Sequence, residues 1–313
     1  MTAKLRVGVI GVGHLGQHHA RLLASMDGVE LVGICDSNRA RADEIASKFG
    51  GQVFVDSREL VGRVDAVTVA VPTIAHVEVA LPFLDAGIAT LVEKPIAPSV
   101  KDADRLVDAA DRRGALLATG HTERFNPAVA AALPLISEPR FIEIHRLGTF
   151  PERSLDIDVI FDLMIHDLDL LLNVVKSEVM AIEAVGVNVL TPKADIANAR
   201  LRFASGCIAN VTASRISRER VRKARFFQND AYVSIDYAAQ ELEVFRLVKD
   251  GMKGGARPII HGGKVEVVSE EPLRRELEDF RDAIRTGRRP GVTGRDGRDA
   301  LALATRVAET MET

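Results

Sequence analysis

Short apolar runs alternate with segments of helical spacing over the first 121 residues. The runs are rich in valine and isoleucine, and helical segments follow most of them, for example residues 74–86 and 99–113. A strand buried on both faces reads as a continuous apolar run, and strands alternating with helices are typical of a parallel sheet covered on both faces. The pattern predicts an α/β domain with a doubly wound parallel sheet over residues 1–122. Its strand-like runs are LRVGVI, LVGIC, QVFV, DAVTVAV, ATLVEK and ALLATG.

The pattern changes after Asn126-Pro127, a favourable opening for a helix. Helices are expected over about 127–136 and 158–175. Turn signals such as Ala204-Ser205-Gly206 join consecutive strands, which indicates an antiparallel sheet. Residues 123–294 therefore predict a second, α+β domain with a mostly antiparallel sheet. Its strands are expected near 139–147, 179–190, 196–204, 207–214, 223–235 and 241–248.

Two further helices are predicted in the C-terminal part, separated by TGRRPGVTG. The last one, about residues 295–313, can fold back on the first domain. Glycines interrupt the pattern between 250 and 264, which predicts a mobile loop there.

The stretch Gly11-Val12-Gly13-His14-Leu15-Gly16 joins the first apolar run to the first helical segment. In a GxGxxG turn the first glycine permits a tight turn, the second lets backbone approach a pyrophosphate, and the third allows close packing of helix on strand. The helix start then offers free N–H groups and a positive dipole end to the phosphates. Asp36, 20 residues past Gly16, can accept hydrogen bonds from ribose hydroxyls and would repel a 2′-phosphate. The turn predicts a Rossmann site for NAD, favoured over NADP, although Arg39 nearby leaves that preference open.

Polar, non-periodic stretches follow three of the apolar runs, at Val71-Pro72-Thr73, Glu93-Lys94-Pro95 and 121–126. Ligands of open parallel sheets lie outside the carboxyl ends of the strands. Lys94 in that position would place a donor beside a substrate oxygen, and a plain surface lysine is the equal alternative. The residues expected at the cofactor are Gly11, Gly13, His14, Leu15, Gly16, Asp36, Val71, Pro72, Thr73, His76, Glu93 and Lys94.

The predicted helix DVIFDLMIHDLDLLLNVV, residues 158–175, carries acidic residues among apolar ones. At helical spacing most of them share one polar stripe, whereas Asp167 points elsewhere, as a cap or an ion-pair partner. Such a stripe suits the floor of a cleft. His166 can take a hydroxyl proton, and Asp162 one turn back can orient its imidazole. No second histidine at ligand spacing supports a zinc site, so no metal is expected. The stripe consists of Asp158, Asp162, His166, Asp169 and Asn173.

Three motifs together, GxGxxG at 11–16, Glu93-Lys94-Pro95 and Asp162-x-x-x-His166, resemble the Gfo/Idh/MocA oxidoreductase family along the whole chain. The resemblance implies a Rossmann domain that binds NAD(P) and a C-terminal domain whose open, mostly antiparallel sheet holds a sugar or polyol. It implies that Lys94, Asp162 and His166 are catalytic. One departure is Met164, where the family commonly has a glycine. The residues then expected at the substrate are His121, Arg124, Asn126, Arg153, Asp158, Asp162 and His166.

Further stretches are similar to one branch of this family, whose members oxidise the 3-hydroxyl of UDP-N-acetylglucosamine on the route to an amide-linked lipid A. These are HTERFNPAV, DLMIHDLDLLL, DIANARLRF and NVTASRISRERVRKARFF. Residues 215–225 hold six basic side chains, and guanidinium groups suit a diphosphate. A solvated edge strand, or an oligomer contact paired with acids, is an equal reading for any single arginine.

Composition limits the partners. The formal net charge of -3 gives no overall field that would attract nucleic acid or an anionic membrane. No apolar run approaches the roughly 18 residues of a membrane-spanning helix. Cys35 and Cys207 lie inside apolar runs and read as core residues, and His18 and His19 read as packing or surface residues. We expect a cytoplasmic enzyme that takes a sugar or nucleotide sugar, and a homodimer or homotetramer through the C-terminal sheet.

Three other functions stay open. One keeps the reaction but changes the substrate to a free polyol such as inositol, or a simple sugar. Another is NAD-dependent glycoside hydrolysis, which the family's scaffold can support. A third is a non-catalytic NAD-binding regulator, which the intact set of Lys94, Asp162 and His166 disfavours.

Overall fold

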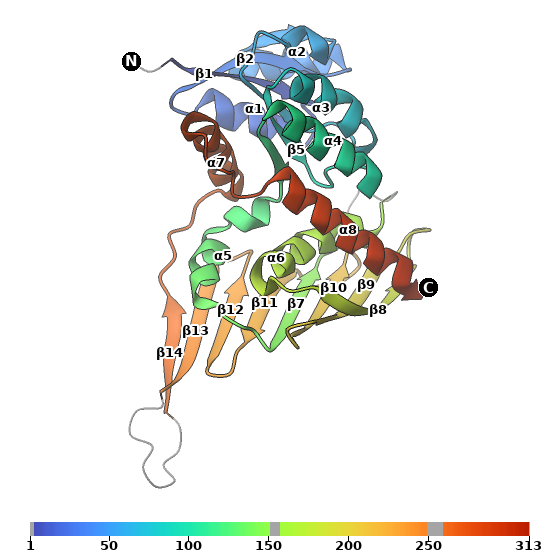
Figure 1. Ribbon diagram of the computed structural model, residues 1–313, viewed down its shortest axis with the longest axis vertical. Helices are drawn as coiled ribbons and strands as arrows, with labels where there is room; N and C mark the ends of the chain where they lie inside the picture. The colour runs from blue at the N-terminus through green and yellow to red at the C-terminus, as the bar shows by residue number, and fades with distance from the viewer. Residues whose placement is uncertain (1–2, 151–156, 249–258, 313) are drawn as a thin grey trace. The chain divides into compact units, whose positions relative to one another are not determined.

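The computed structural model describes residues 3–150, 157–248 and 259–312 (Figure 1). The chain divides into two compact units, residues 1–122 with 271–301 and residues 123–270 with 302–313. Arg153, expected at the substrate, lies outside the described residues, as does most of the loop expected at 250–264.

The first unit contains a six-stranded sheet in the order β3-β2-β1-β4-β5-β6, and every pairing is parallel. This is the doubly wound arrangement that the apolar runs predicted. α1 (Gly16–Ala24) contacts α2 (Arg39–Phe49), while α3 (His76–Asp85) contacts α4 (Val100–Arg113). These two pairs of helices form layers on opposite sides of the sheet (Figure 1). The strands are β1 Leu5–Ile10, β2 Val29–Cys35, β3 Gln52–Phe54, β4 Ala66–Val69, β5 Ala89–Glu93 and β6 Leu117–Gly120.

Helix α7 (Pro272–Thr286) belongs to this first unit, so the prediction that residues 123–294 form the second domain was wrong for this segment. Leu277 and Phe280, 0% and 2% exposed, join the core cluster that contains Leu22 and Leu23 of α1. The apolar face of α7 therefore completes the cover of the first sheet. Helix α8 (Gly294–Thr310) contributes residues to both units.

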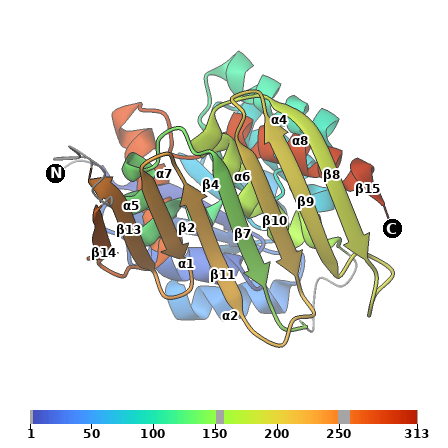
Figure 2. The same ribbon diagram turned by 90° about the horizontal axis from the view of Figure 1, so that it is seen from below.

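The second unit contains a nine-stranded sheet in the order β14-β13-β12-β11-β7-β10-β9-β8-β15. All its pairings are antiparallel except β7 with β10 and β8 with β15. Helices α5 (Pro127–Ala132) and α6 (Ile165–Val175) lie over one face, and the other face is open in Figure 2. The strands are β7 Phe141–Leu147, β8 Val179–Val187, β9 Ile196–Phe203, β10 Ile208–Ser214, β11 Val221–Phe227, β12 Ala231–Asp236, β13 Glu241–Val248, β14 Ile259–Val265 and β15 Met311–Glu312.

Two strand predictions need correction. The single strand expected at 223–235 is a hairpin of β11 and β12, because the chain reverses at residues 228–230, where Gln228 N donates to Ala231 O over 2.8 Å. Residues 259–264 are not loop, since they form most of β14 and pair with β13. The glycines there, Gly262 and Gly263, lie in the ladder opposite Phe245 and Val244.

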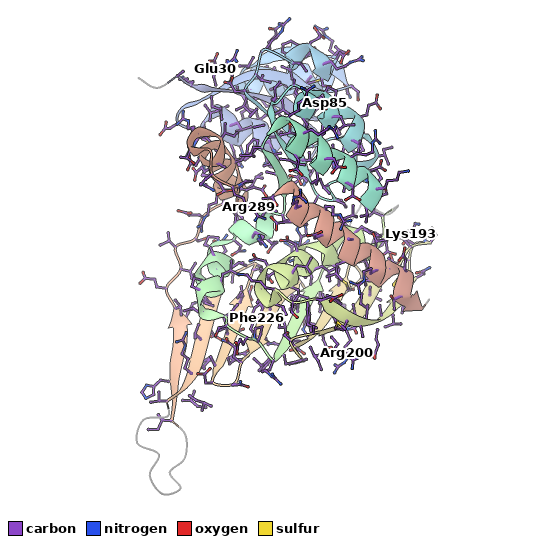
Figure 3. The ribbon with its side chains drawn as sticks, viewed as in Figure 1. Glu30, Asp85, Lys193, Arg200, Phe226 and Arg289 are labelled. Atoms are coloured by element: carbon purple, nitrogen blue, oxygen red, sulfur yellow. The ribbon has the colours of Figure 1, made fainter. Side chains whose placement is uncertain are left out.

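Side chains alternate between the two faces of the second sheet along its central strands. On β9 the buried Ala197, Ala199 and Leu201 alternate with exposed residues, among them Arg200. Figure 3 shows Arg200 on the open side, whereas Phe226 of β11 is buried on the helix-covered side. The period of two therefore places one residue set under α5 and α6 and the other on the uncovered face.

The helix expected at 158–175 is not one regular α-helix. Residues Ile160–Met164 form a π-helical turn, and α6 begins at Ile165, whose N–H donates to the carbonyl of Ile160. A π-turn holds more residues per turn than an α-helix, so the predicted i, i+4 stripe does not continue through it. Only His166, Asp169 and Asn173 keep regular α-helical spacing.

The described residues contain no helix long and apolar enough to cross a membrane. Cys35 and Cys207 are both buried, as expected of core residues. Burial raises the pKa of each thiol to about 11.

Candidate active site

Two glycines of the GxGxxG turn, Gly11 and Gly16, are closely packed against backbone, and the remaining one, Gly13, faces open space. Gly11 has a φ of +81°, and a Cβ added there would lie 2.7 Å from backbone atoms of Ala70. A Cβ on Gly16 would lie 1.7 Å from the carbonyl oxygen of Gly11, so helix and turn need that glycine to pack. A Cβ on Gly13 would meet nothing within 4 Å. The open position is the one where backbone approaches a pyrophosphate, so the residues present fit a dinucleotide.

Asp36 at the end of β2 is tied to this turn. Its carboxylate accepts hydrogen bonds from the backbone N–H of Val12 and of Asn38, each over 2.8 Å. Arg41 donates from Nε to the carbonyl of Val12 over 2.9 Å. The half-buried carboxylate keeps further acceptor capacity for ribose hydroxyls. Arg39, which had left the cofactor preference open, pairs with Asp43 over 3.7 Å on the surface of α2.

His76 links two of the three polar stretches that follow strands. It is 1% exposed, and its ring nitrogens lie 3.0 Å from the carbonyl oxygen of Pro95 and 2.9 Å from that of Val71. Burial lowers the pKa of His76, although both carbonyls oppose the shift. The residue therefore braces the turn after β4 against the turn after β5, where Lys94 lies.

The carboxylate before Lys94 lies in a buried cluster that sequence reasoning missed. Glu93, 5% exposed, has Oε1 3.1 Å from Nε2 of His19, which is 0% exposed. The same carboxylate leaves no room for a side chain at Gly120, where a Cβ would lie 2.9 Å from its atoms. Glu276 of α7, 2% exposed, completes the cluster and accepts a hydrogen bond from Thr122 Oγ1 over 3.1 Å. His19 is thus a buried hydrogen-bond partner of Glu93, in addition to the packing role that its helix position indicated.

This cluster holds more carboxylate than cation. Burial alone would raise the pKa of Glu93, but the hydrogen bond from His19 and the charge of Lys94 outweigh it and lower that pKa. Burial and the charge of Glu93 raise the pKa of Glu276 well above its usual value. Within the described residues, Oε1 of Glu276 and Nδ1 of His19 are buried without a hydrogen-bond partner. The two carboxylates therefore repel each other, and Glu276 holds its proton more tightly than Glu93 does.

Two buried acidic residues of α6 each pair with a different arginine. Asp167, 0% exposed, receives two hydrogen bonds of 2.8 Å from Nε and Nη2 of Arg146 on β7. This confirms the prediction that Asp167 is an ion-pair partner off the polar stripe. Asp169, 2% exposed, lies 3.8 Å from Nη1 of Arg124. His166 and Asp162 are only half-buried, so solvent still reaches their side chains, unlike those of Asp167 and Asp169.

Arg146 is the centre of this second network. Burial alone would lower its pKa, but the carboxylates of Asp167 and Glu123 outweigh that and raise it. Its guanidinium also lies 5.4 Å from the ring centroid of Tyr237. The carbonyl of Tyr237 accepts a hydrogen bond from the amide of Asn126 over 2.9 Å. These contacts fix the strand ends beneath the start of α6.

The residues expected at the substrate have distinct roles in the structure. Asn126 caps α5 by accepting a hydrogen bond from Ala128 N over 3.0 Å, and Asp158 accepts one from Ile160 N over 2.9 Å at the start of the π-turn. His121 is 1% exposed and belongs to the first unit, whereas Arg124 belongs to the second. Their assignment to substrate stays a prediction.

A hollow of about 630 Å³ in the first unit lies away from these residues. It is lined by Asp65, Ala89 and Leu117, at the starts of β4, β5 and β6. Ligands of such sheets bind at the opposite, carboxyl ends of the strands. The hollow is therefore separate from the dinucleotide turn.

Comparison with known proteins agrees with this geometry. Residues 5–121 match the model of an oxidoreductase family with an NAD-binding Rossmann fold, and residues 137–233 match the Gfo/Idh/MocA C-terminal domain. The chain belongs to the Gfo/Idh/MocA oxidoreductase family. This confirms the resemblance inferred from the three motifs, and with it the prediction that the protein is an NAD-binding oxidoreductase.

Among Gfo/Idh/MocA relatives, UDP-N-acetylglucosamine 3-dehydrogenase of Acidithiobacillus ferrooxidans is 39% identical over 98% of this chain and 97% of its own length. A solved structure of that enzyme superimposes with a TM-score of 0.91, covering 99% of this chain and 98% of the other at 38% identity. Inositol 2-dehydrogenase of Rhizobium meliloti is 28% identical over 96% of this chain and 94% of its own length. Levoglucosan dehydrogenase in complex with NADH and levoglucosan, at 20% identity and a TM-score of 0.86, shares the fold over 98% of this chain and 97% of its own.

Proposed function

We propose that the protein uses NAD to oxidise the 3-hydroxyl of UDP-N-acetylglucosamine to a ketone. The observation that carries this proposal is the 39% identity to a dehydrogenase of that substrate over nearly the whole of both chains. Two inositol dehydrogenases also align over nearly the full length, but at 27% and 28% identity. The nucleotide sugar is therefore the first candidate, and a polyol is the second.

His166 is the proposed general base. It lies at the start of α6, immediately after the π-turn, and its half-buried side chain can reach a substrate hydroxyl from a largely apolar helix. Asp162, within the π-turn, is proposed to orient the imidazole and stabilise its charged form. Asp158, Arg124, Arg153, His121 and Asn126 are proposed to bind the substrate.

Lys94 is the proposed donor to the substrate oxygen. It follows Glu93 at the carboxyl end of β5, and its backbone N–H donates to the Glu93 carboxylate over 3.3 Å. An ammonium held there stabilises the negative charge that develops on oxygen as its proton leaves. NAD, when bound at the GxGxxG turn, accepts the hydride. The residues proposed to hold it are those of the turn, Asp36, the stretch 71–73, His76, Glu93 and Lys94.

The open face of the second sheet is proposed to bind another copy of the chain, giving a homodimer or homotetramer. Four rings form a row across neighbouring strands, with centroid distances of 5.6, 5.0 and 6.2 Å. Each ring lies directly opposite the next in the strand register. Light scattering checks the assembly, and Phe227→Asp is expected to reduce it to a smaller species. The row consists of Phe141, Phe227, Tyr232 and Phe245.

We further propose that the reaction takes place in the cytoplasm, on the route to the 3-amino sugar of an amide-linked lipid A, where an aminotransferase would consume the ketone.

The test is NADH formation with a panel of UDP-N-acetylglucosamine, N-acetylglucosamine, myo-inositol and glucose 6-phosphate, each with NAD and with NADP. Activity with inositol alone would overturn the nucleotide-sugar proposal. Release of a sugar without net NADH would indicate glycoside hydrolysis instead. His166→Asn is expected to lower kcat about 100- to 10,000-fold, and an unchanged rate in that variant and in Lys94→Ala would remove both from the chemistry.

A further inference from the structure

Strand β11 distributes its basic residues between two faces of the sheet. On the open face, Lys223 pairs with Asp236 over 3.3 Å and Arg225 pairs with Glu143 over 2.8 Å. Arg222 lies on the other face of the sheet, the same face as the buried Ala224 and Phe226. Arg222 therefore lies on the opposite face from Lys223 and Arg225, which are both paired with carboxylates.

Arg215, the first residue of the basic run, is occupied by the fold itself. It is 2% exposed, and its Nε donates to Asp195 Oδ1 over 2.9 Å. Its Nη1 donates to the carbonyl of Ile157 over 2.7 Å, and its Nη2 to Thr191 Oγ1 over 2.9 Å. Arg215 is therefore a structural residue that closes the loop before β9, and it leaves no edge of its guanidinium for a substrate.

Arg222 differs from both groups. It lies directly opposite Arg146 in the pairing of β11 with β7. Like charges directly opposite on one face repel. Arg146 is compensated by Asp167 and Glu123, but the side chain of Arg222 makes no hydrogen bond or ion pair with any residue that the structure describes. Its backbone is fixed, because its carbonyl accepts a hydrogen bond from Tyr237 N over 2.9 Å.

The surroundings of Arg222 are short of negative charge. The side chain is solvent-accessible, and Arg220, two residues earlier, lies nearby with its Nη2 3.4 Å from Thr149 Oγ1. Desolvation and the charges of Arg146 and Arg220 lower the pKa of Arg222, and the carboxylates of Glu123 and Asp167 only partly oppose them. Three guanidinium groups therefore share two carboxylates, and an added anion would restore the balance.

We propose that Arg222, assisted by Arg220, binds the diphosphate of the nucleotide sugar and so sets the specificity of the enzyme. The inference rests on the proposed function. A guanidinium presents paired N–H donors that match two phosphate oxygens, which suits a diphosphate better than a neutral polyol.

The position of Arg222 also suits the proposed chemistry. Arg222 is within electrostatic range of Asp167, the residue that directly follows His166. In UDP-N-acetylglucosamine the diphosphate is attached at C1, two ring carbons from the 3-hydroxyl. An anion held beside the start of α6 therefore leaves the sugar ring within reach of the proposed base.

The test compares binding of UDP and of uridine by calorimetry to the full chain with NAD present. Arg222→Gln is expected to weaken UDP binding about 10- to 100-fold, since it removes charged hydrogen bonds, and to leave uridine binding unchanged. Arg222→Lys should fall between Gln and the parent, because it keeps the charge but loses the paired donors. Arg220→Gln is expected to have the smaller effect of the two arginines.

Arg246→Gln is the matched control. Arg246 lies on the same face of the sheet, on β13, but is paired with Ala231 at the far end of β12. UDP binding should match the parent protein in this variant. In steady-state assays Arg222→Gln should raise KM for UDP-N-acetylglucosamine with little change in kcat, and should not affect NAD.

The outcomes separate the two proposals. If the parent oxidises UDP-N-acetylglucosamine and Arg222→Gln binds UDP as tightly as the parent, the role of Arg222 is overturned while the proposed function stands. If the parent binds neither UDP nor the nucleotide sugar, the proposed function falls as well, whatever Arg222 does. Binding of glucose 6-phosphate without UDP would likewise overturn the diphosphate site. Thermal melting checks that the variants are folded, as expected for an accessible side chain.

Discussion

Both proposed catalytic elements stand next to a buried carboxylate, and the two carboxylates are held by different means. Asp167, after His166, is gripped by two hydrogen bonds from Arg146, a group that is always protonated. Glu93, before Lys94, is held by His19 and has a second carboxylate, Glu276, in the same cluster. In the first arrangement burial raises the pKa of Asp167, and the charge and hydrogen bonds of Arg146 oppose that shift. In the second, burial and the charge of Glu93 raise the pKa of Glu276 well above its usual value. The comparison indicates that the stronger effect of pH lies in the cluster beside the β5 turn, where two carboxylates are close together.

The largest expected effect is on the arginine-held carboxylate. Arg146→Met leaves Asp167 buried without its cation, so the free energy of unfolding should fall by about 3–5 kcal/mol. Urea unfolding followed by circular dichroism measures it. The double variant Arg146→Met with Asp167→Leu should recover most of the loss, because no buried charge remains. A loss below about 1 kcal/mol in the single variant would show that the pair is not what holds the helix.

A smaller loss is expected at the histidine-held carboxylate. His19→Leu removes the donor to Glu93 and should lower the free energy of unfolding by about 1–3 kcal/mol. His19→Gln keeps an N–H donor and should lose less. His18→Gln, one residue away and half-buried, is the control and should match the parent protein. Equal losses in the Leu and Gln variants of His19 would argue against the hydrogen bond.

The third prediction concerns pH. The pKa of Glu276 is higher in the folded protein than in the unfolded chain, so the folded state holds this proton more tightly. Its contribution is present at acid pH and is lost as pH rises through the folded pKa. Glu276→Gln keeps the shape without the titration, so its stability relative to the parent should rise with pH by at most about 1.4 kcal/mol per unit, until the folded pKa is passed.

The groups that face Glu276 are Thr122, Glu93 and Asp279, and they are unchanged in that variant. Glu278→Gln, on the same helix but exposed, is the control and should keep the parent's pH profile. Parallel profiles for Glu276→Gln and the parent from pH 5 upward, about the unfolded value of a glutamate, would contradict the prediction.

The smallest expected effect separates burial from geometry. Arg6 grips Asp65 with two side-chain hydrogen bonds, of 3.2 and 2.7 Å, much as Arg146 grips Asp167, but both side chains are exposed. Arg6→Met should therefore cost much less stability than Arg146→Met, and less still at high salt. A loss as large as that of Arg146→Met would mean that pairing geometry, more than burial, decides the strength.

The features that were predicted correctly from the sequence are those that depend on the local spacing of apolar and polar residues. The six apolar runs of the first unit became its six strands, and the glycine turn stands where its spacing placed it. The sorting of Asp167 from the rest of the helix was also predicted, because side-chain direction in α6 follows regular spacing. The roles of Lys94, Asp162 and His166 remain predictions.

The remainder depends on contacts between distant segments. His19, Glu93 and Glu276 come from α1, β5 and α7, and no spacing links them. The membership of α7 in the first unit follows from burial of Leu277 and Phe280 against α1, which pattern reading cannot assign. That Arg222 lies opposite Arg146 could be seen only from the strand register, which the hairpin of β11 and β12 and the pairing of β11 with β7 set.

The π-turn at Ile160–Met164 has a consequence for how this family is aligned. A π-turn is equivalent to one extra residue inserted into an α-helix, so deleting one residue there would restore regular winding. Because the wider turn absorbs the extra residue, such a deletion would leave Asp158 and His166 facing nearly the same directions as before. Relatives that differ by one residue at this place can therefore present the same side chains to the substrate, and counting turns is a safer guide to equivalent positions than counting residues.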